Sequence, residues 1–271
     1  MWIDSHCHLN HKNIEPIGTP TEIITAAHEN GVDAMLTINV EIASEYKEIS
    51  AIAAAHDNIW CSLGTHPNHA SVEAEKALTA ADIIAITKTN DKIVAIGETG
   101  LDYHYDFATI PDQKASFIKH LEVCAETGLP VIIHSRDADE DMAAMLRDHG
   151  AGKDFMGVMH CFSSGAKLAE DALDMGFHIS FSGILTFKSA QELRDIAMTV
   201  PMDKLLVETD APYLAPMPRR GKTNQPAYVA HTGEFLADLR GVSAEEMAKI
   251  TKDDFFNLFT RAHDTYAEQG A

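Results

Sequence analysis

The sequence lacks any hydrophobic stretch long enough to cross a bilayer. No apolar run in its 271 residues approaches the roughly 18 residues that a membrane-spanning helix requires. The amino-terminal segment, from Met1 to His6, has neither the basic start nor the apolar stretch of a secretory signal peptide. We therefore expect a soluble, cytoplasmic protein that has no contact with a membrane.

Cysteine is scarce, and no cysteine pair is closely spaced. The residues Cys7, Cys61, Cys124 and Cys161 form no Cys-x-x-Cys motif, which favours buried free thiols in a reducing compartment over a disulfide framework or a zinc ribbon. The sequence also lacks a linker rich in proline, glycine and serine, and its composition shows no break. We therefore predict a single domain that spans residues 1–271.

Positive charge is also in short supply. The chain has 21 Lys and Arg residues against 41 Asp and Glu residues, which gives a formal net charge of −20. A broad surface for duplex DNA needs clustered cations that displace counterions from the phosphates, so this balance argues against such a surface. It does not exclude a nucleic-acid end that is threaded into one local site. The sequence shows no sign of an obligate protein partner.

Short runs rich in valine, isoleucine, leucine and methionine recur along the chain. Because these runs are apolar on both faces, they are typical of strands in a parallel sheet that is buried on both sides. With 45% hydrophobic and 23% charged residues, the composition is that of an ordinary globular protein. We predict strands near residues 2–6, 33–39, 59–64, 93–98, 130–135, 156–161, 177–182 and 204–209.

Amphipathic stretches separate the predicted strands. The segment 112–127, for example, places Phe117, Leu121 and Cys124 on one face of a helix that Gly128 ends. About eight strand–helix repeats are typical of either a (β/α)8 TIM barrel or a doubly wound α/β sheet. The number of repeats and the positions of the polar residues favour the barrel. One long irregular segment, residues 211–229, is of a length that is usually functional or disordered.

Side chains that bind metals recur where the predicted strands end. In a barrel, the carboxyl ends of the strands converge on one face. On an extended strand, a His-x-His pair points both imidazoles the same way. Each residue alone has a structural explanation, but burying so many polar groups in one pocket would be costly without a cation. The joint pattern predicts a metal site formed by His6, His8, Glu98, His134, His160 and Asp210.

The remaining histidines carry less information. Two stay undecided, because His104 follows Glu98 closely and His178 lies inside a predicted strand. Cys7 and Cys161 adjoin proposed ligands, but on a strand their side chains face away, so we interpret them as packing residues. We interpret the histidines in helical or loop stretches as surface residues: His11, His28, His56, His69, His120, His149 and His263.

Taken in order, seven motifs resemble the TatD family of metal-dependent hydrolases, which are amidohydrolase-like barrels. The similarity runs from Met1 to about Phe259, and its motifs are IDSHCHL, LGTHP, IGETGLDYHYD, PVIIHSRDA, GVMHCFSSG, LLVETDAPYLAP and RGKTNQPAYV. The resemblance implies a (β/α)8 barrel, divalent metal ions and deoxyribonuclease activity, often described as 3′-to-5′ exonuclease activity. The DNA substrate would then be single-stranded or an end.

The resemblance also implies roles for individual residues. His6 and His8 match the ligands of one metal ion, and Glu98 matches the carboxylate that bridges two ions. His134 and His160 match ligands of the second ion, while Asp210 matches the carboxylate after the last strand. The cofactors would be two divalent ions of zinc, magnesium or manganese. Gln225 stands where the family commonly has glutamate, which puts a local salt bridge in doubt.

These roles suggest a hydrolytic mechanism and a set of substrate contacts. Glu98 would bridge the ions, and Asp210 would orient or deprotonate the attacking water. His66 is either a phosphate donor or a structural turn residue, and Arg136 is either a phosphate fork or part of a surface ion pair. The cations Arg219, Arg220 and Lys222 either attract an anionic chain or lie in a solvated loop. Residues that either stack on bases or pack are Tyr103, Tyr105 and Tyr213.

Two rival functions remain open. The first is hydrolysis of a C–N or ester bond in a small metabolite, as in related amidohydrolase-like barrels. Many of those bridge their metals with a carboxylated lysine, whereas this chain offers Glu98, which favours the nuclease. The second is a scaffold that keeps a metal only for stability.

Overall fold

Eight parallel strands form the central sheet of the computed structural model, which describes residues 1–150 and 156–266. Each strand pairs with the next one along the chain, and every pairing is parallel. The strands are β1 Trp2–Cys7, β2 Val32–Thr37, β3 Ile59–Leu63, β4 Ile93–Asp102, β5 Val131–Arg136, β6 Gly157–Met159, β7 His178–Phe181 and β8 Leu205–Val207.

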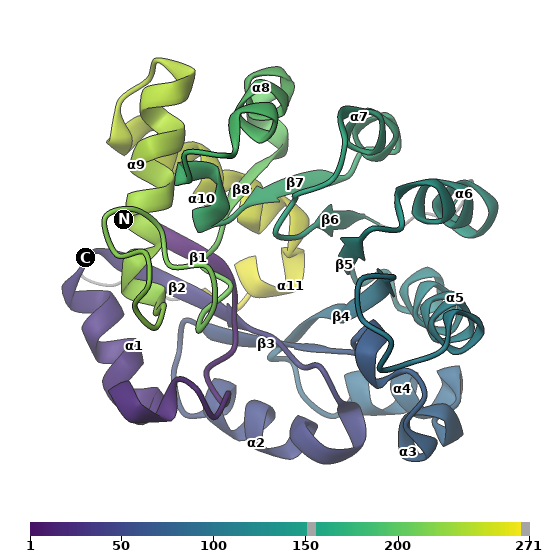
Figure 1. The fold of residues 1–271 in the computed structure, drawn as a ribbon. Coiled ribbons are helices and arrows are strands. Elements are labelled where there is room, and N and C mark those ends of the chain that lie inside the picture. The colour runs from purple at the N-terminus through teal and green to yellow at the C-terminus, as the bar shows by residue number, and fades with distance from the viewer. Residues whose placement is uncertain (151–155, 267–271) are drawn as a thin grey trace.

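The sheet closes because the chain beyond β8 runs alongside β1. Cys7 and Ala211 form a parallel bridge. The Asp210 N–H donates to the His6 carbonyl, and the His8 N–H donates to the Ala211 carbonyl, each over 2.9 Å. Figure 1 shows the helices arranged around this ring of strands. The predicted (β/α)8 TIM barrel is therefore confirmed.

Helices follow the strands and cover the outside of the barrel. The predicted helix 112–127 begins two residues earlier, after the Thr109 hydroxyl, which accepts the N–H of Asp112, and it ends at Gly128. No helix in residues 1–150 and 156–266 has the length and apolar character needed to cross a membrane. The helices are α1 Pro20–Glu29, α2 Ile42–Ala54, α3 Glu73–Ala77, α4 Ala80–Thr87, α5 Ile110–Thr127, α6 Asp139–Gly150, α7 Ala166–Asp174, α8 Gln191–Thr199, α9 Val229–Arg240, α10 Ala244–Leu258 and α11 Thr260–His263.

The apolar core has two parts. The larger one lies between the sheet and the surrounding helices. The smaller one takes residues from every strand except β7 and joins them to Phe255, Phe256 and Phe259 around α10 and α11. In Figure 1 the yellow α11 is seen within the ring of strands. One end of the barrel is thus filled with apolar side chains, which leaves the polar groups to the other end.

Side chains alternate between the two faces of each strand, and this alternation places the polar side chains at that other end. Ile132 and Val158 belong to the inner apolar cluster, and His134 and His160 lie two residues further along the chain. Leu206 is in the same cluster, and Asp210 follows four residues later, after the end of β8. Because alternate side chains share a face, the potential ligands follow the apolar filling at the carboxyl ends.

Three predicted strand boundaries needed correction. β4 runs on to Asp102 rather than ending near residue 98, because it keeps pairing with β5 as far as Arg136. β6 and β8 are shorter than predicted, and the chain turns just beyond each of them. Cys161 and Asp210 have φ angles of 42° and 55°, a left-handed conformation that a strand cannot contain. His160 therefore lies just beyond β6 rather than in it, and Asp210 lies three residues after the end of β8.

Candidate metal centre

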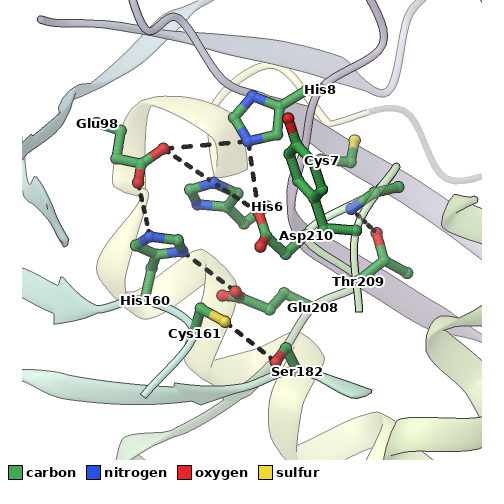
Figure 2. Close-up of polar contacts among 12 residues, drawn as sticks. His6, Cys7, His8, Glu98, His160, Cys161, Ser182, Glu208, Thr209 and Asp210 are labelled. Atoms are coloured by element: carbon green, nitrogen blue, oxygen red, sulfur yellow. Dashed lines mark hydrogen bonds and ion pairs between the residues drawn. The ribbon is translucent and has the colours of Figure 1, made fainter. Parts of the chain in front are cut away.

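The six predicted metal ligands come together at the carboxyl end of the barrel. β1 carries His6, and His8 follows directly, so both imidazoles point to the same side of the chain. Glu98 lies within β4 and is 3% exposed, which makes it the most central carboxylate of the group. Figure 2 shows Glu98 facing His6 and His8 on one side and His160 on the other.

One oxygen of Glu98 faces three imidazoles. Oε1 lies 2.8 Å from His160 Nε2, 3.0 Å from His134 Nδ1 and 3.4 Å from His66 Nε2. His160 Nε2 and His134 Nδ1 are themselves 3.4 Å apart. Two ligand atoms that bind the same ion, each at about 2.1 Å, lie roughly 3.0 to 3.4 Å apart at octahedral or tetrahedral angles. This group of donors therefore has the spacing of a metal site.

The other oxygen of Glu98 faces a second group. Oε2 lies 3.4 Å from His6 Nε2 and 4.0 Å from His8 Nε2. Asp210 Oδ1 lies 3.4 Å from His8 Nε2 and 3.7 Å from His6 Nε2. The spacing is slightly wider than in the first group, and the ligand atoms of His6, His8 and Asp210 lie within 4.8 Å of one another. Three groups of donors in the described residues could hold a metal ion: His6 with Glu98 and His160, His6 with His8 and Asp210, and His66 with Glu98 and His134.

The carboxylates of the cluster are held ionised, whereas the imidazoles divide into two kinds. Burial opposes the charge on Glu98, but the imidazoles of His160 and His66 and two hydrogen bonds outweigh it and hold the pKa of Glu98 well below its usual range. Burial also opposes the charge on Asp210, yet the hydrogen bond from His8 leaves its pKa lowered. Burial lowers the pKa of His66 to about 3. Burial opposes the charge on His8, His134 and His160 too, but nearby carboxylates outweigh it and raise the pKa of all three rings, so a bound metal ion would displace their protons. Ionised carboxylates and neutral imidazoles are the forms that bind metals.

His6 gives an independent sign that a cation belongs here. Both of its ring nitrogens are buried, and neither has a hydrogen-bond partner in the described part of the chain. Burial, followed by the nearby His160, lowers the pKa of His6 and keeps its ring neutral. A buried polar atom without a partner is costly, and a metal ion would satisfy the lone pair of Nε2. The residues present therefore fit a bound metal.

Two carboxylates that the sequence analysis missed orient these imidazoles. Asp102 Oδ2 lies 3.1 Å from His134 Nε2, and Glu208 Oε1 lies 3.2 Å from His160 Nδ1. Both carboxylates are buried. The signal for Glu208 was present, because it lies two residues before Asp210 and two after Leu206, on the same face. Asp102 had no such signal, since β4 was predicted to end before it.

His66 lies with the potential ligands rather than at a distance from them. Its Nε2 faces Glu98 Oε1, and its Nδ1 accepts the N–H of Asn68 at 3.1 Å. His66, Glu98 and His134 together form one of the groups that could hold an ion. The sequence analysis had placed His66 either against substrate or in a structural turn. The structure adds a third interpretation, in which His66 is itself a metal ligand.

The predicted substrate-binding cations lie on the rim of the barrel. The Arg136 guanidinium carbon is 5.0 Å from the centre of the Tyr105 ring, and Arg136 lines a cavity of about 620 Å³. Arg220 lies over Phe187 and, with Lys222, lines another cavity of about 610 Å³. Arg219 lies over Tyr228 at 5.2 Å. In residues 1–150 and 156–266 none of these four cations forms a salt bridge.

The other two tyrosines predicted as substrate contacts, Tyr103 and Tyr213, both have polar partners. Tyr103 is half-buried, and its hydroxyl donates to Asp141 at 2.6 Å. Tyr213 remains 46% exposed, and its hydroxyl pairs with His11 Nε2 at 2.9 Å. Gln225 follows Asn224, which is buried and bonds the Thr209 carbonyl. The loop is thus anchored by Asn224 without an acidic residue at position 225.

One histidine was placed wrongly. His120 is fully buried, its Nδ1 donates to the Ser116 carbonyl and its Nε2 accepts the N–H of Thr65. It is a core residue because α5 packs against the loop after β3. The undecided His178 is buried in β7, and the undecided His104 is exposed and contacts Asp137. At least partly exposed, as predicted, are His11, His28, His56, His69, His149 and His263.

The cysteines behave as predicted. None of the four forms a disulfide bond in the described residues, and all are buried except Cys161, which is half-buried. Cys7 Sγ lies 3.6 Å from the Leu36 carbonyl, and Cys161 Sγ lies 3.1 Å from the Ser182 hydroxyl. Within the described residues neither sulfur belongs to a potential metal-binding cluster. They are packing residues, and burial raises the pKa of both thiols well above the usual range.

An eight-stranded parallel barrel with these clusters at its carboxyl end has the features of a metal-dependent barrel hydrolase. Residues 3–260 match the family model described as TatD related DNase. The chain is 42% identical over 262 residues to the metal-dependent hydrolase YcfH of Escherichia coli K12, covering 95% of each protein. This chain therefore belongs to the TatD family of metal-dependent hydrolases.

Two further relatives extend the comparison. The chain is 31% identical over 243 residues to the 3′-5′ ssDNA/RNA exonuclease TatD of Klebsiella pneumoniae, covering 88% of this chain and 90% of that protein. The crystal structure of YJJV, a TatD homologue from Escherichia coli K12, matches with a TM-score of 0.86 at 26% identity, covering 96% of this chain and 98% of that one.

Proposed function

We propose that this protein hydrolyses phosphodiester bonds in DNA and holds two divalent metal ions, one on each side of Glu98. The orientation of the Glu98 carboxylate carries the proposal. Its Oε1 faces His134 and His160, and its Oε2 faces His6 and His8. A carboxylate whose oxygens face separate sets of imidazoles is suited to bridge two cations.

The donor sets support the following ligands. His6, His8 and Asp210 would hold one ion, His134 and His160 would hold the other, and Glu98 would bind both. Imidazole ligands favour zinc by affinity, while the carboxylates also admit manganese and, through its availability, magnesium. When bound, such ions polarise a phosphoryl oxygen and lower the pKa of a bound water.

Asp210 is positioned to handle the proton of the attacking water. Its side chain keeps 14% of its surface exposed, against 3% for Glu98, so water at the mouth of the barrel can reach it. The lowered pKa of Asp210 keeps it ionised. It takes one proton as the water oxygen bonds to phosphorus and the bond from phosphorus to the sugar oxygen breaks. The departing sugar oxygen then takes a proton from solvent.

The rim cations support a nucleic-acid substrate. Arg219, Arg220 and Lys222 are exposed, and Lys12 joins the last two in lining the 610 Å³ cavity. Pro212 also lines that cavity, and Pro212 follows Asp210 by only two residues. In a chain of charge −20, this local excess of cations would draw a polyanion toward the metal centre. The family description and the named activity of the Klebsiella relative support the same substrate.

The direct test is hydrolysis of a labelled single-stranded oligonucleotide beside a panel of small amides and esters, each with Mg²⁺, Mn²⁺ or Zn²⁺. We expect metal-dependent cleavage of the oligonucleotide by the wild type and a loss of at least about 100-fold in kcat for Asp210→Ala. Cleavage of an amide or ester but not of DNA would favour the small-metabolite hydrolase. Metal binding without any hydrolysis would favour the scaffold.

A second test concerns the rim cations. The triple variant of Arg219, Arg220 and Lys222 to alanine should raise KM for DNA about tenfold or more, and KM for a small phosphodiester less than twofold. It should also flatten the dependence of log KM on log salt by about 2, since each contact to single-stranded DNA contributes about 0.7. Its matched control replaces three exposed lysines on outer helices, Lys47, Lys167 and Lys249. Equal effects on both substrates would remove the anchoring role.

A further inference from the structure

An exposed aromatic pair lies on the rim of the barrel, in the loop that follows β4. Tyr105 is 42% exposed and Phe107 is 68% exposed, and their rings stack with centroids 5.3 Å apart and planes 22° apart. On the neighbouring strand β5, Arg136 places its guanidinium carbon 5.0 Å from the centre of the Tyr105 ring. His104 contacts the same ring edge-on at 4.8 Å.

The packing of the barrel does not account for this pair. Neither Tyr105 nor Phe107 belongs to either apolar cluster or to the half-buried residues packed against them. Tyr103, two residues earlier, does pack against the core, and its hydroxyl is held by Asp141. The aromatic pair thus exposes large apolar surface that the described part of the chain leaves uncovered.

Asp102 ties the aromatic pair to the metal centre. Its Oδ1 accepts the backbone N–H of His104 at 3.0 Å and that of Tyr105 at 3.1 Å. Its Oδ2 lies 3.1 Å from Nε2 of His134, whose Nδ1 faces Glu98. The loop backbone is therefore two hydrogen bonds away from an imidazole of the metal cluster. This arrangement connects the loop that carries the aromatic pair to the strand ends that carry the metal cluster.

The charges around the pair favour a neutral ring over a phosphate. Asp106 and Asp137 are exposed beside it, and Asp137 Oδ2 lies 3.1 Å from His104 Nδ1. The cations that suit a sugar–phosphate backbone follow β1 and β8. In a closed ring of eight strands, β8 and β1 lie opposite β4 and β5. Aromatic faces and a guanidinium group suit a planar heteroaromatic ring.

We propose that Tyr105, Phe107 and Arg136 form a stacking subsite for the unpaired base of the nucleotide at which the chain is cut. The inference rests on the proposed nuclease function, and it adds which part of the substrate this subsite binds. The sugar–phosphate backbone would cross the mouth of the barrel from the cations after β8 and β1, and the base would rest against the aromatic pair after β4. Because stacking does not read base edges, the subsite accepts any base, but only one that is free of a complementary strand.

The test compares oligonucleotides that carry either a normal base or an abasic residue at one end, with each end tried in turn. For the intact substrate, the double variant Tyr105→Ala, Phe107→Ala should raise KM about tenfold and leave kcat within about twofold. For the substrate that is abasic at the cleaved end, KM should change less than about twofold. Tyr105→Phe keeps the ring and should behave as wild type, as should Met198→Ala, which alters an equally exposed apolar residue on α8.

A second measurement does not require turnover. An oligonucleotide ending in 2-aminopurine should lose fluorescence on mixing with the metal-loaded wild type, before any cleavage, and should keep it with the double variant. Phe107→Ala alone should weaken the quenching, and it alters the more exposed ring, which guards against a folding defect in the double variant. Quenching that the double variant retains in full, or no quenching by the wild type, would overturn the proposal.

The outcomes separate this inference from the nuclease proposal. If DNA is cleaved and the variants lose equally on intact and abasic substrates, the stacking subsite is wrong and the nuclease stands. If DNA is not cleaved but quenching depends on the aromatic pair, the nuclease is wrong and the subsite stands. If light scattering shows that the double variant changes only the oligomeric state, the pair is a self-association contact and the subsite is wrong.

Discussion

Single carboxylates decide which nitrogen each imidazole offers to the metal centre. A ring that donates one N–H to a carboxylate presents the lone pair of its other nitrogen. Asp102 contacts Nε2 of His134 and leaves Nδ1 toward Glu98, whereas Glu208 contacts Nδ1 of His160 and leaves Nε2 toward Glu98. Two histidines with opposite ring orientations thereby converge on one oxygen.

This arrangement makes Asp102 a positioning residue that can be tested. In Asp102→Asn the side chain loses its charge. If the amide oxygen keeps the backbone N–H groups of His104 and Tyr105, the NH2 group faces His134 and cannot accept its N–H. We expect metal affinity at the site of His134 and His160 to fall about 10- to 100-fold, measured by titration calorimetry with Mn²⁺ or Zn²⁺. Asp106→Asn, in the exposed loop nearby, is the matched control. Unchanged affinity in Asp102→Asn would show that His134 is oriented by something else.

Asp254 on α10 predicts a pH dependence that is separate from the metal centre. Its side chain accepts the N–H of Leu205 at 3.1 Å, and burial raises its pKa from 3.8 to about 7. Between pH 4 and pH 7 the folded protein therefore retains a proton that the unfolded chain releases. The folded state binds more protons, so the contribution of Asp254 to stability falls as pH rises through this window.

The variant Asp254→Asn should remove that loss. In urea unfolding with EDTA present, we expect its free energy of unfolding to exceed that of the wild type by less at pH 5 than at pH 8, because at pH 5 the folded wild type still keeps the proton. At pH 8 we expect it to be higher than the wild type by on the order of 1–3 kcal/mol. If the difference in free energy of unfolding between the variant and the wild type is the same at both pH values, Asp254 is ionised in the folded protein throughout.

At the scale of elements, the close contact between β4 and β5 sets the distance between Glu98 and His134. Gly100 has a φ of 138°, and a Cβ atom built on it would lie 2.1 Å from the His134 carbonyl oxygen. Only glycine allows this backbone conformation together with this approach. The glycine thereby lets two strands that both carry potential ligands pair side by side.

Replacing this glycine should damage both stability and metal binding. We expect Gly100→Ala to lower the free energy of unfolding by more than about 3 kcal/mol and to weaken metal binding, because the β4–β5 register must shift. Gly128→Ala, at the end of α5, is the control: its φ is also positive, at 71°, but a Cβ atom there meets nothing within 4 Å. It should lower stability by about 1 kcal/mol. Denaturant unfolding of both variants checks the difference, and equal losses would contradict a steric cause.

At the scale of the whole molecule, one end of the barrel provides apolar packing, and the other end carries the potential metal ligands. One end is filled by apolar side chains from the strands, α10 and α11. The other holds buried imidazoles and carboxylates that lack enough partners of their own, as His6 shows. A cation that binds only the folded barrel should therefore stabilise the whole fold.

Removal of metal tests this expectation. At 100 times its dissociation constant, a bound ion adds about 2.7 kcal/mol, which for a barrel of this size raises Tm by roughly 5–10 °C. We expect EDTA to lower Tm by that amount and Glu98→Gln to abolish most of the difference, while Glu122→Gln on the outer face of α5 keeps it. Thermal melts with and without EDTA measure it. Identical Tm values for the wild type in both conditions would rule out a tightly held ion.

The amino-acid sequence by itself determined the strand–helix alternation and the positions at which polar side chains end the strands, and it favoured the barrel over a doubly wound sheet. These features are local, because burial on both faces and the period of two are written along each short segment. Only the tertiary structure decided that His120 is buried and that Asp102 and Glu208 orient the imidazoles. It also decided that His66 lies against Glu98. Each of these depends on a contact between segments far apart in the chain, and such distances follow from how the strands pair rather than from any residue's own neighbours.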